Sequence, residues 1–488
     1  MTREVVHSIL EDTPEAVARR LAEAPHAAAL VELRADRLRA GDVAGLVRRA
    51  GRSIVTVRSI EDGGSFDGST EEKRTILRAA LDAGCAFVDV EWDGPLRALA
   101  SGPEAARTIV SHHGAPCDAA ALTTLFDAMA ETKAARLKIV PKAARPPELR
   151  AVFSLLERAR RVRRALASFA MGPAGSLSRI AALGWGSWGT YGSAARGRET
   201  GDGQYSTREL LEVFRVLELS DRTQWFGLCG TPLAGSPSPA LHAAAYGALS
   251  LDAVYVPVDT GEIEDVAAIT GEGGLLPLSG FGVTIPLKEQ SARRCARLDA
   301  SAACGSANTV VIGPAGWEGY NTDAPAALAL IREHLDPSGS AAAVVGAGGT
   351  GRAMAAALKE AGAVVTLYNR SEARGVETAR GLGVASAPLA TLPRAHWDLL
   401  VQATPAGRHG EEILLRRHLN GRLVLDAAYG DEPTPLVRAA RSRGLTVVDG
   451  LALLAAQAAL QFERLTGRPA PKPQMAAALG PWHVSASA

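Results

Sequence analysis

The sequence predicts an α/β protein: an N-terminal (β/α)8 (TIM) barrel followed by a two-lobed α/β region that contains a Rossmann dinucleotide-binding domain. Three observations point to this fold class. From residue 5 to residue 220, eight short apolar runs alternate with amphipathic segments, which is the pattern of a (β/α)8 barrel. Further on, Gly346, Gly348 and Gly351 lie between an apolar run and a helical pattern, as in a nucleotide-binding strand–turn–helix unit. At 488 residues, the chain is also too long for a single core.

The eight expected strands of the first half are short and apolar, as buried parallel strands are. They cover Val5–Leu10, Ala28–Leu33, Ser53–Val57, Phe87–Glu91, Arg107–Ser111, Arg136–Val140, Ala165–Met171 and Ser187–Tyr191. Helical patterns cover Pro14–Ala24, Glu71–Ala83, Ala119–Thr132, Pro147–Arg160 and Thr207–Leu219. An open doubly wound sheet is the alternative architecture, although such a sheet would reach this length with fewer strands.

Composition and charge describe an ordinary globular protein. Hydrophobic residues make up 47% of the chain and charged residues 22%, and the formal net charge is +1. This balance gives no reason to expect a nucleic acid or an anionic membrane surface as partner. The N-terminal segment lacks a signal-peptide pattern, and no apolar run is long enough to cross a membrane. We therefore expect a cytoplasmic protein.

The cysteines are scattered and show no C-x-x-C spacing. They are Cys85, Cys117, Cys229, Cys295 and Cys304. This arrangement fits free thiols in a reducing compartment rather than a disulfide framework. No set of four ligands accompanies them, so no metal is expected.

Polar residues gather at the carboxyl ends of the expected barrel strands, where barrel enzymes place their chemistry. Lys138 is the most informative because it lies inside the apolar segment LKIV. Burial there disfavours the ammonium form and makes a neutral amine available as a nucleophile. His112 and His113 follow the fifth strand and can shuttle protons, so the region suits Schiff-base chemistry on a ketone. Taken alone, Lys138 is better explained as a lysine that extends to solvent from a strand end.

Seven segments of the first half resemble the type I 3-dehydroquinate dehydratase family. They are VELRADRL, TVRSIEDGG, VDVEW, SHHG, LKIV, MGPAGSLSR and GDGQ, and they cover nearly all of residues 28 to 205. By this resemblance, Lys138 forms an imine with the substrate ketone and His113 removes the α-proton, with His112 as the alternative proton carrier. The resemblance also implies substrate-binding roles for Glu32, Arg34, Arg58, Asp62, Arg179, Thr200 and Gln204.

A second group of polar residues precedes the glycine triplet. Ser236 and Ser238 stand before a helical pattern, where they can cap the helix or bind a carboxylate. Lys288 follows a proline turn, and Asn308 and Asp323 lie at turn positions. A lysine–carboxylate pair can protonate the alkoxide that forms when a ketone accepts a hydride. This group therefore favours reduction of a hydroxylated ketone.

The glycine triplet predicts a dinucleotide site, and the residues that follow it indicate which dinucleotide. Ala341–Val345 and Val364–Leu367 are the expected strands, with the helix Arg352–Ala361 between them. The glycines allow the backbone to approach a pyrophosphate at the helix N-terminus. After the second strand come Asn369, Arg370, Ser371 and Arg374. Two guanidiniums without a carboxylate suit a 2′-phosphate, so the expected cofactor is NADP(H).

The second half resembles the shikimate dehydrogenase family as far as the C-terminus. The matching segments are GTPLAGSPSP, VTIPLKE, GSANTVV, GYNTD, GAGGTGRA, NRSEAR, DAAYGDEPTPL and DGLALLAAQAALQFERLTG. One departure is QATPAGRHG, which stands where the family usually has Asn-Ala-Thr-Ser-x-Gly-Met near the nicotinamide.

The same resemblance implies a role for each matching residue. Lys288 and Asp323 act on the reacting oxygen and the adjacent hydroxyl. Substrate contacts are implied for Ser236, Ser238, Thr284, Asn308 and Gln457. Contacts with NADP(H) are implied for Gly346, Ala347, Gly348, Gly349, Thr350, Gly351, Asn369, Arg370, Ser371, Arg374, Thr404 and Gly450.

Together the two resemblances imply a two-activity enzyme of the shikimate pathway, which leads to chorismate and the aromatic amino acids. The first half would dehydrate 3-dehydroquinate to 3-dehydroshikimate, and the second would reduce that product to shikimate with NADPH. The expected division is a barrel at residues 1–221, a substrate-binding lobe at 222–335 completed by 449–480, and a Rossmann domain at 336–448. Two alternatives remain: a second half that prefers quinate, and a non-catalytic sensor of pathway metabolites.

Overall fold

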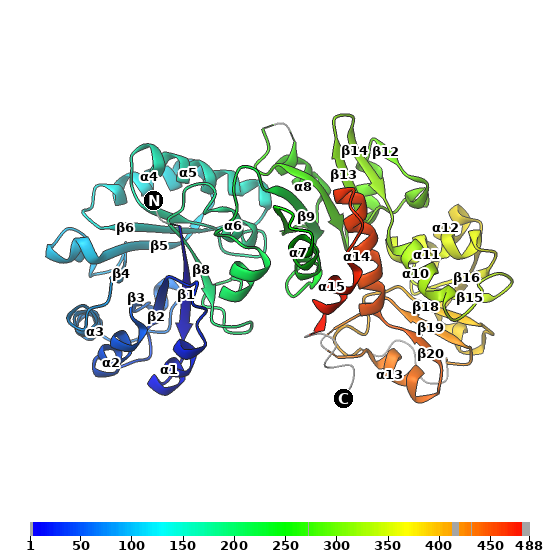
Figure 1. Ribbon diagram of the computed structural model, residues 1–488, viewed down its shortest axis with the longest axis horizontal. Coiled ribbons are helices and arrows are strands. Elements are labelled where there is room, and N and C mark those ends of the chain that lie inside the picture. The colour runs from blue at the N-terminus through cyan, green and yellow to red at the C-terminus, as the bar shows by residue number, and fades with distance from the viewer. Residues whose placement is uncertain (1–2, 272, 412–418, 431, 481–488) are drawn as a thin grey trace.

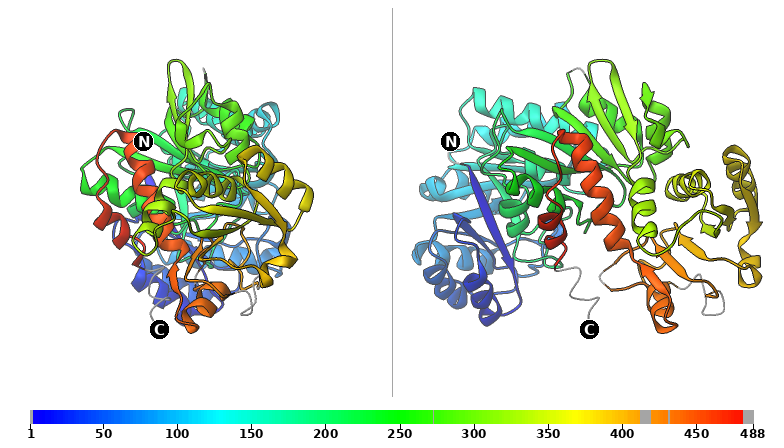
Figure 2. Two further views of the ribbon diagram at one scale, coloured as in Figure 1. Left: turned by 90° about the vertical axis from the view of Figure 1, so that its right-hand side faces the viewer. Right: turned by 45° about the vertical axis from the view of Figure 1, so that its right-hand side comes forward.

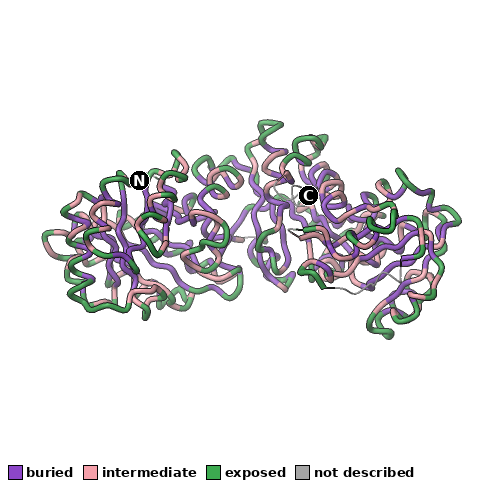
Figure 3. Tube along the Cα trace, turned by 90° about the horizontal axis from the view of Figure 1, so that it is seen from below, coloured by how far each residue is buried: buried purple, intermediate pink, exposed green. Residues whose placement is uncertain are grey.

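Three β-sheets lie in a row along the long axis of the molecule (Figure 1). The computed structural model describes residues 3–271, 273–411, 419–430 and 432–480. In the part of the chain that it describes, no helix is long and apolar enough to cross a membrane. Figure 3 shows buried backbone running through the interior of each unit, with exposed residues mostly on the outer helices and loops.

The first sheet contains eight strands in the order β7-β6-β5-β4-β3-β2-β1-β8. Each pair of neighbouring strands in this order is parallel. The gap between β7 and β8 is bridged where the Trp188 amide donates to the Leu166 carbonyl oxygen at 3.1 Å. The strands are β1 (Glu4–Leu10), β2 (Leu30–Arg34), β3 (Ser53–Thr56), β4 (Phe87–Glu91), β5 (Thr108–Pro116), β6 (Arg136–Lys142), β7 (Leu166–Ser168) and β8 (Gly189–Ser193). The barrel prediction is confirmed, and the open doubly wound sheet is wrong.

Helices surround the barrel strands and bury apolar faces against them. They are α1 (Pro14–Glu23), α2 (Ala40–Ala50), α3 (Thr70–Asp82), α4 (Ala119–Ala130), α5 (Leu149–Arg161) and α6 (Ser176–Ala181). One expected helix, Thr207–Leu219, is wrong in length. The helical segment runs only from Thr207 to Val213, with Glu209–Val213 as a wide π-turn, and Arg215 adopts a left-handed φ of 49° that an α-helix cannot continue through.

The second sheet is mixed and has the order β10-β9-β11-β13-β14-β12. Its strands are β9 (Gln224–Gly230), β10 (Ala253–Asp259), β11 (Leu278–Val283), β12 (Arg297–Leu298), β13 (Thr309–Gly313) and β14 (Gly316–Tyr320). Its helices are α7 (Ser238–Ala248), α8 (Ile263–Thr270), α9 (Lys288–Arg294) and α10 (Asp323–Arg332). Three of the four helices begin next to a predicted site residue, because Ser238, Lys288 and Asp323 are their first residues.

The third sheet is parallel, in the order β17-β16-β15-β18-β19-β20. Its order reverses at β15, which makes the end of that strand a topological switch point where ligands bind in such sheets. The strands are β15 (Ala341–Val345), β16 (Val364–Asn369), β17 (Ala385–Pro388), β18 (Leu399–Gln402), β19 (Leu423–Asp426) and β20 (Thr446–Val448). The helices are α11 (Gly349–Glu360), α12 (Glu372–Leu382) and α13 (Pro435–Ser442).

The chain then returns from the third sheet to the second. Helix α14 (Gly450–Thr466) lies between the two units, and α15 (Lys472–Ala477) follows it, as the right-hand view of Figure 2 shows. Leu454, Ala458 and Phe462 of α14 share one apolar core with Phe226 of the second sheet. Helix α14 therefore packs against the unit that contains the second sheet.

The barrel packs directly against the second sheet. A single apolar core extends from barrel residues to Trp225, Val256 and Phe281 of the second sheet. At its edge, Arg145 forms an ion pair with Asp265, whose side chain is only 2% exposed. The two halves therefore share buried surface rather than a flexible linker.

Candidate active sites

A cavity of about 430 Å³ opens at the carboxyl ends of the barrel strands. Every barrel residue expected to touch substrate lines it, although these residues come from distant points of the sequence. They are Glu32, Arg34, Arg58, Asp62, His113, Lys138, Arg179, Thr200 and Gln204. This is the end of a (β/α)8 barrel where catalytic groups gather.

Lys138 is buried in this cavity rather than extended to solvent. Its side chain is 7% exposed, and its Nζ lies 3.8 Å from Glu32 Oε1 and 3.9 Å from Asp89 Oδ2. The same Nζ lies 4.0 Å from the centre of the Tyr191 ring. Burial lowers the pKa of Lys138, while the carboxylates of Glu32 and Asp89 oppose that shift. The amine is therefore more readily deprotonated than a surface lysine, as a nucleophile requires.

Glu32 stays ionised beneath this amine. Burial raises its pKa, but the charges of Lys138 and Arg34, with hydrogen bonds from Ser8 and Thr56, bring the pKa down to about 2. Ser8 Oγ donates to Glu32 Oε2 at 2.6 Å, and Thr56 Oγ1 donates to Oε1 at 2.8 Å. A fixed carboxylate at this position stabilises positive charge on Lys138, such as that of a protonated imine.

Of the two adjacent histidines, only His113 lines the cavity. Its Nδ1 lies 3.2 Å from Asp62 Oδ2. His112 instead places Nδ1 2.9 Å from Asp93 Oδ2, outside the cavity. Successive side chains of a strand alternate in direction, so the two rings are presented to different surroundings. The geometry favours His113 as the proton carrier.

The surroundings of His113 favour its neutral form. Burial lowers its pKa well below 6.5, and the charges of Arg58 and Lys138 shift the pKa in the same direction. A neutral imidazole can accept a proton from a substrate carbon.

We expect the acid limb of dehydration activity to lie below pH 6.5, because activity falls only as pH drops through the depressed pKa of His113. Removing a nearby positive charge with Arg58→Gln should move that limb to higher pH. Initial rates of 3-dehydroquinate turnover between pH 4 and pH 8 measure both effects. A limb that stays in place, or moves down, in the variant would contradict this assignment.

Arg58 links these groups to a residue that sequence reasoning did not select. It contacts Asp62 Oδ2 at 2.5 Å, Asp89 Oδ1 at 2.9 Å and Ser111 Oγ at 3.0 Å. Asp89 is fully buried, and its Oδ2 atom has no hydrogen-bond partner in the described structure. The signal in the sequence was a carboxylate inside the apolar strand VDVEW. Tyr191, which lies against Lys138, had no such signal.

The loop after β8 covers one side of the cavity. Gln204 Oε1 accepts from the Thr200 amide at 2.7 Å, and Gln204 Nε2 donates to the Tyr191 carbonyl oxygen at 3.2 Å. Arg34 reaches the Thr200 carbonyl oxygen at 3.4 Å. Arg179 is buried and donates to the Asp202 carbonyl oxygen at 2.9 Å. Burial lowers the pKa of Arg179 to about 10, so it remains a cation able to hold a carboxylate.

The second site centres on Lys288. Its Nζ lies 2.5 Å from Asp323 Oδ2 and 2.9 Å from Thr350 Oγ1. These residues begin α9 and α10 and lie near the start of α11, so three helix N-termini meet here. Thr350 belongs to the glycine-rich loop, so the lysine–carboxylate pair lies next to the expected dinucleotide site. This placement suits a group that donates a proton beside a hydride carrier.

Two amides extend the site from this pair. Asn308 Nδ2 donates to Asp323 Oδ1 at 2.8 Å and to Thr322 Oγ1 at 2.9 Å. Gln457 Oε1 lies 3.4 Å from Asn308 Nδ2, although Gln457 belongs to α14, 149 residues later. The predicted set Lys288, Asn308, Asp323 and Gln457 is therefore brought together in space.

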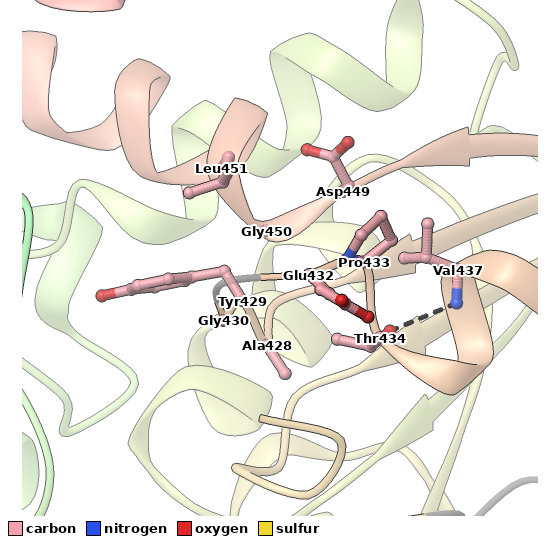
Figure 4. A pocket seen from close by; sticks show the side chains of 10 residues that line it. All are labelled: Ala428, Tyr429, Gly430, Glu432, Pro433, Thr434, Val437, Asp449, Gly450 and Leu451. Carbon is pink, nitrogen blue, oxygen red and sulfur yellow. Dashed lines mark hydrogen bonds between the residues drawn. The ribbon is translucent and has the colours of Figure 1, made fainter. Parts of the chain in front are cut away.

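The serines lie at the start of α7. The Ser238 amide is 3.4 Å from Ser236 Oγ, and Ser238 is buried. Ser236 also interacts with the side chain of Tyr429, a residue that sequence reasoning missed because nothing in DAAYG marks it. Figure 4 shows Tyr429 extending from a small cavity near Gly450, away from Thr434 and Val437.

Thr284 is the predicted substrate contact with the weakest support. Its amide donates to the Cys229 carbonyl oxygen at 2.9 Å, and its methyl group lies against Gly230. No bond joins it to Lys288 or Asp323 in the described residues.

The glycine-rich loop fits a dinucleotide phosphate. Helix α11 begins at Gly349, and Gly348 at its N-cap supplies no side chain to its free amides. A Cβ on Gly351 would lie 1.9 Å from the Gly346 carbonyl oxygen, so only glycine permits this turn. Ser306 Oγ is buried without a partner and lies beside Gly349. Thr404 packs against Gly346 from the neighbouring strand end.

The residues after β16 divide between two tasks. Asn369 Oδ1 accepts from the Ala347 amide at 3.1 Å and so fixes the glycine loop. Arg370 and Ser371 are exposed at the start of α12. Arg374 Nη2 contacts Glu289 Oε1 of α9 at 2.8 Å. Arg374 therefore has a carboxylate partner, whereas Arg370 is exposed directly after Asn369, the residue that fixes the glycine loop.

A further cavity of about 700 Å³ lies between the barrel and the second sheet. It shares part of its wall with the barrel cavity, namely Arg34, Gly63, Thr200, Gly201, Asp202 and Gln204. Its opposite wall includes residues 233–236, which end at Ser236 of the second site. The loop after β8, which covers the first site, and the loop at residues 233–236, which we call the serine loop, therefore line the same cavity.

Family models match both halves of the chain. Residues 5–221 match the type I 3-dehydroquinase model. Residues 228–310 match the shikimate dehydrogenase substrate-binding domain, and residues 450–479 match the shikimate 5′-dehydrogenase C-terminal domain.

Sequence relatives cover the second half or nearly the whole chain. Shikimate dehydrogenase (NADP(+)) of Halobacterium salinarum is 41% identical over 260 residues, which is 52% of this chain and 97% of the relative. The bifunctional 3-dehydroquinate dehydratase/shikimate dehydrogenase of Arabidopsis thaliana is 28% identical over 478 residues, 91% of this chain and 78% of the relative.

Two solved structures are also similar to the chain. Shikimate 5-dehydrogenase of Thermus thermophilus is 33% identical with a TM-score of 0.49, covering 53% of this chain and 99% of its own. Dehydroquinate dehydratase and shikimate dehydrogenase from S. pombe is 23% identical with a TM-score of 0.43, covering 98% of both chains. From the sequence matches, the chain belongs to the shikimate dehydrogenase family, with a type I 3-dehydroquinase domain joined ahead of it.

Proposed function

We propose that this chain is a bifunctional 3-dehydroquinate dehydratase and NADP-dependent shikimate dehydrogenase. The observation that carries the proposal is a buried lysine in each half, one in a barrel cavity and one beside a glycine-rich loop. The first half dehydrates 3-dehydroquinate, and the second reduces the resulting 3-dehydroshikimate to shikimate. The sensor alternative is not favoured, because a regulator does not need either amine.

In the barrel, the neutral amine of Lys138 attacks the substrate ketone, and loss of one water forms an imine. His113 takes the α-proton, and the electron pair moves toward the imine nitrogen. His113 then returns this proton to the departing hydroxyl, which leaves as water. A second water hydrolyses the imine and frees Lys138, so dehydration is the only net change. Glu32 stabilises the positive imine, and Arg179 holds the substrate carboxylate.

In the second half, the loop from Gly346 to Gly351 would hold NADPH, which when bound would supply the hydride for the ketone carbon of 3-dehydroshikimate. Lys288 delivers a proton to the developing alkoxide, with Asp323 fixing the ammonium. Asn308 and Gln457 bind ring hydroxyls, and Ser236 and Ser238 bind the carboxylate. Neither half needs a metal in this scheme.

We propose the domain division that the sequence suggested: residues 1–221, residues 222–335 with 449–480, and residues 336–448. The described strands of each sheet fall within one of these units. A cytoplasmic location stays a prediction, for which the free thiols at all five cysteine positions give support. The quinate-preferring alternative is tested by comparing turnover of shikimate and quinate with each nicotinamide cofactor.

The coupled reaction tests the proposed function. With 3-dehydroquinate and NADPH, the wild-type chain should form shikimate and oxidise one NADPH for each product. Because the loop that covers the first site and the serine loop of the second site line one cavity, we expect a shorter lag than in an equal mixture of Lys138→Ala and Lys288→Ala chains. In that mixture the intermediate must cross bulk solvent. Equal lags would rule out direct transfer, and absence of shikimate would rule out the function.

Arg370→Ala should raise the KM for NADPH by about tenfold or more and change the KM for NADH little, because a guanidinium acts on the 2′-phosphate alone. Arg380→Ala is the matched control, since Arg380 is also exposed but lies in the last turn of α12, the helix that follows Arg370. Steady-state rates with both cofactors measure the effect. An equal loss with NADPH and NADH would contradict the 2′-phosphate argument.

A further inference from the structure

Arg408 lies on the loop that follows β18, in the segment QATPAGRHG. Its guanidinium carbon is 5.0 Å from the centre of the Tyr429 ring. Its Nε also donates to the Tyr429 carbonyl oxygen over 3.4 Å. Among the described residues, no carboxylate forms an ion pair with Arg408. The Arg408 guanidinium is therefore held by the Tyr429 ring, and its charge remains available to a ligand.

Tyr429 connects this cation to the substrate-binding lobe. It follows strand β19 of the third sheet, yet its ring packs against the apolar core around Phe226 and α14. Burial raises the pKa of Tyr429, while side-chain interactions with Ser236 and Arg408 oppose that shift. Arg408, Tyr429 and Ser236 thus form a row from the Rossmann unit to the serine loop.

The loop backbone fixes where Arg408 begins. Gln402 is 1% exposed, and its Nε2 donates to the Ala406 carbonyl oxygen at 3.0 Å and the Thr404 carbonyl oxygen at 3.2 Å. Gly407 then takes a left-handed φ of 99°, which a side chain would disfavour. The guanidinium is consequently presented by a constrained turn rather than by a freely moving chain.

Arg408 differs from two other cations near the second site, because each of those has a carboxylate partner. Lys288 is paired with Asp323 at 2.5 Å, and Arg374 is paired with Glu289 at 2.8 Å. Each of these cations is already offset by a carboxylate. A substrate that brings its own carboxylate therefore gains most from a cation that has no acidic partner.

We propose that Arg408 determines specificity for anionic substrates at the second site, by placing a positive charge that no described carboxylate offsets beside Tyr429, whose side chain interacts with Ser236. This inference rests on the proposed function, which puts the substrate carboxylate at Ser236 and Ser238. The ring hydroxyls lie at the other end, near Asn308 and Gln457. Arg408 therefore discriminates by the charge of the substrate, whereas the two amides discriminate by its hydroxyl pattern.

Two variants separate charge from shape. Arg408→Met keeps an unbranched side chain without charge, and Arg408→Lys keeps the charge. Oxidation of shikimate and of its neutral methyl ester with NADP⁺ is measured for each. Arg408→Met should raise the KM for shikimate about tenfold while the KM for the ester changes less than about twofold. Arg408→Lys should restore most of the affinity, and added salt should weaken shikimate binding more in the wild type than in Arg408→Met.

Three results would overturn the inference. An equal rise of KM for acid and ester would indicate a packing role, a rise confined to the KM for NADP⁺ would indicate a cofactor contact, and an unchanged KM for shikimate would exclude any role. Arg394→Met, at an exposed position of the same unit, is the matched control. Failure of the wild-type chain to oxidise shikimate would refute the proposed function itself, so the two failures are distinguishable.

Discussion

Replacing Lys138 by alanine is expected to lower kcat for 3-dehydroquinate dehydration by roughly a thousandfold or more, because the other lysine among the described residues that line the cavity, Lys142, is exposed. The physical reason is the pKa of Lys138, which burial lowers while Glu32 and Asp89 hold the cationic imine. Reduction of 3-dehydroshikimate by the same chain should remain within about twofold of wild type. Initial rates of each half-reaction measure the two effects separately.

Borohydride reduction during turnover gives an independent measurement for Lys138. It converts the imine to a stable amine, and mass mapping should find the adduct on the peptide that contains Lys138. Lys133→Ala is the control, since Lys133 is exposed in the loop before β6. Lys138→Ala leaves Glu32 and Asp89 with one cation fewer, so the variant needs a check that the chain remains folded. Intact reductase activity provides that check. An adduct on any other lysine would break the dehydratase assignment.

Replacing Lys288 by alanine is expected to have the mirror-image effect. Reduction of 3-dehydroshikimate should fall by roughly a thousandfold in kcat, because the alkoxide would lose its proton donor. Asp323→Asn should cost less, roughly a hundredfold, because the amide can still hold Lys288 in place but no longer balances its charge. Dehydration of 3-dehydroquinate should be unchanged in both variants.

The Lys288 prediction is checked by kcat and KM for shikimate and NADP⁺, measured in both directions of the reaction. Lys359→Ala on α11 is the control, since Lys359 is exposed and bonds only the Leu382 carbonyl oxygen in the described structure. If Lys288→Ala raised the KM for NADP⁺ with kcat preserved, the residue would be a cofactor contact and the proton-donor role would be excluded.

The barrel could be predicted in detail because buried parallel strands leave a local signal. Each of the eight strands begins within two residues of its expected start. Such strands are covered on both faces, so their sequences read as continuous apolar runs between turns. The glycine loop was equally predictable. A side chain at Gly346 or Gly351 would lie too close to neighbouring atoms, and the spacing of these glycines is enough to indicate such a turn.

Helix length was less predictable where tertiary contacts compete with local preference. The stretch Thr207–Leu219 has a helical pattern, yet it closes after Val213. Leu210, Phe214 and Val216 are all buried. An ideal helix turns about 100° per residue, and the observed wide turn brings these three side chains inward together. The local sequence pattern does not show that these three side chains must be buried together.

Several site residues escaped prediction for the same reason. Tyr191 lies against Lys138 although 53 positions separate them, and Tyr429 reaches Ser236 from another sheet. Neither stands in a pattern that marks chemistry. Asp89 did leave a weak signal, as a carboxylate in an apolar strand, but only its contact with Arg58 gives that signal a meaning.

The sequence by itself determined the order of the strands and helices, the glycine turn and the residue types that each site contains. Those properties depend on short-range periodicity and backbone sterics, which neighbouring residues specify. Only the tertiary structure decided that Lys138 is buried rather than solvated, and that Lys288 meets Asp323 and Thr350 across 35 and 62 residues. Burial and proximity depend on what distant segments place around a group, and the same local sequence is compatible with either outcome.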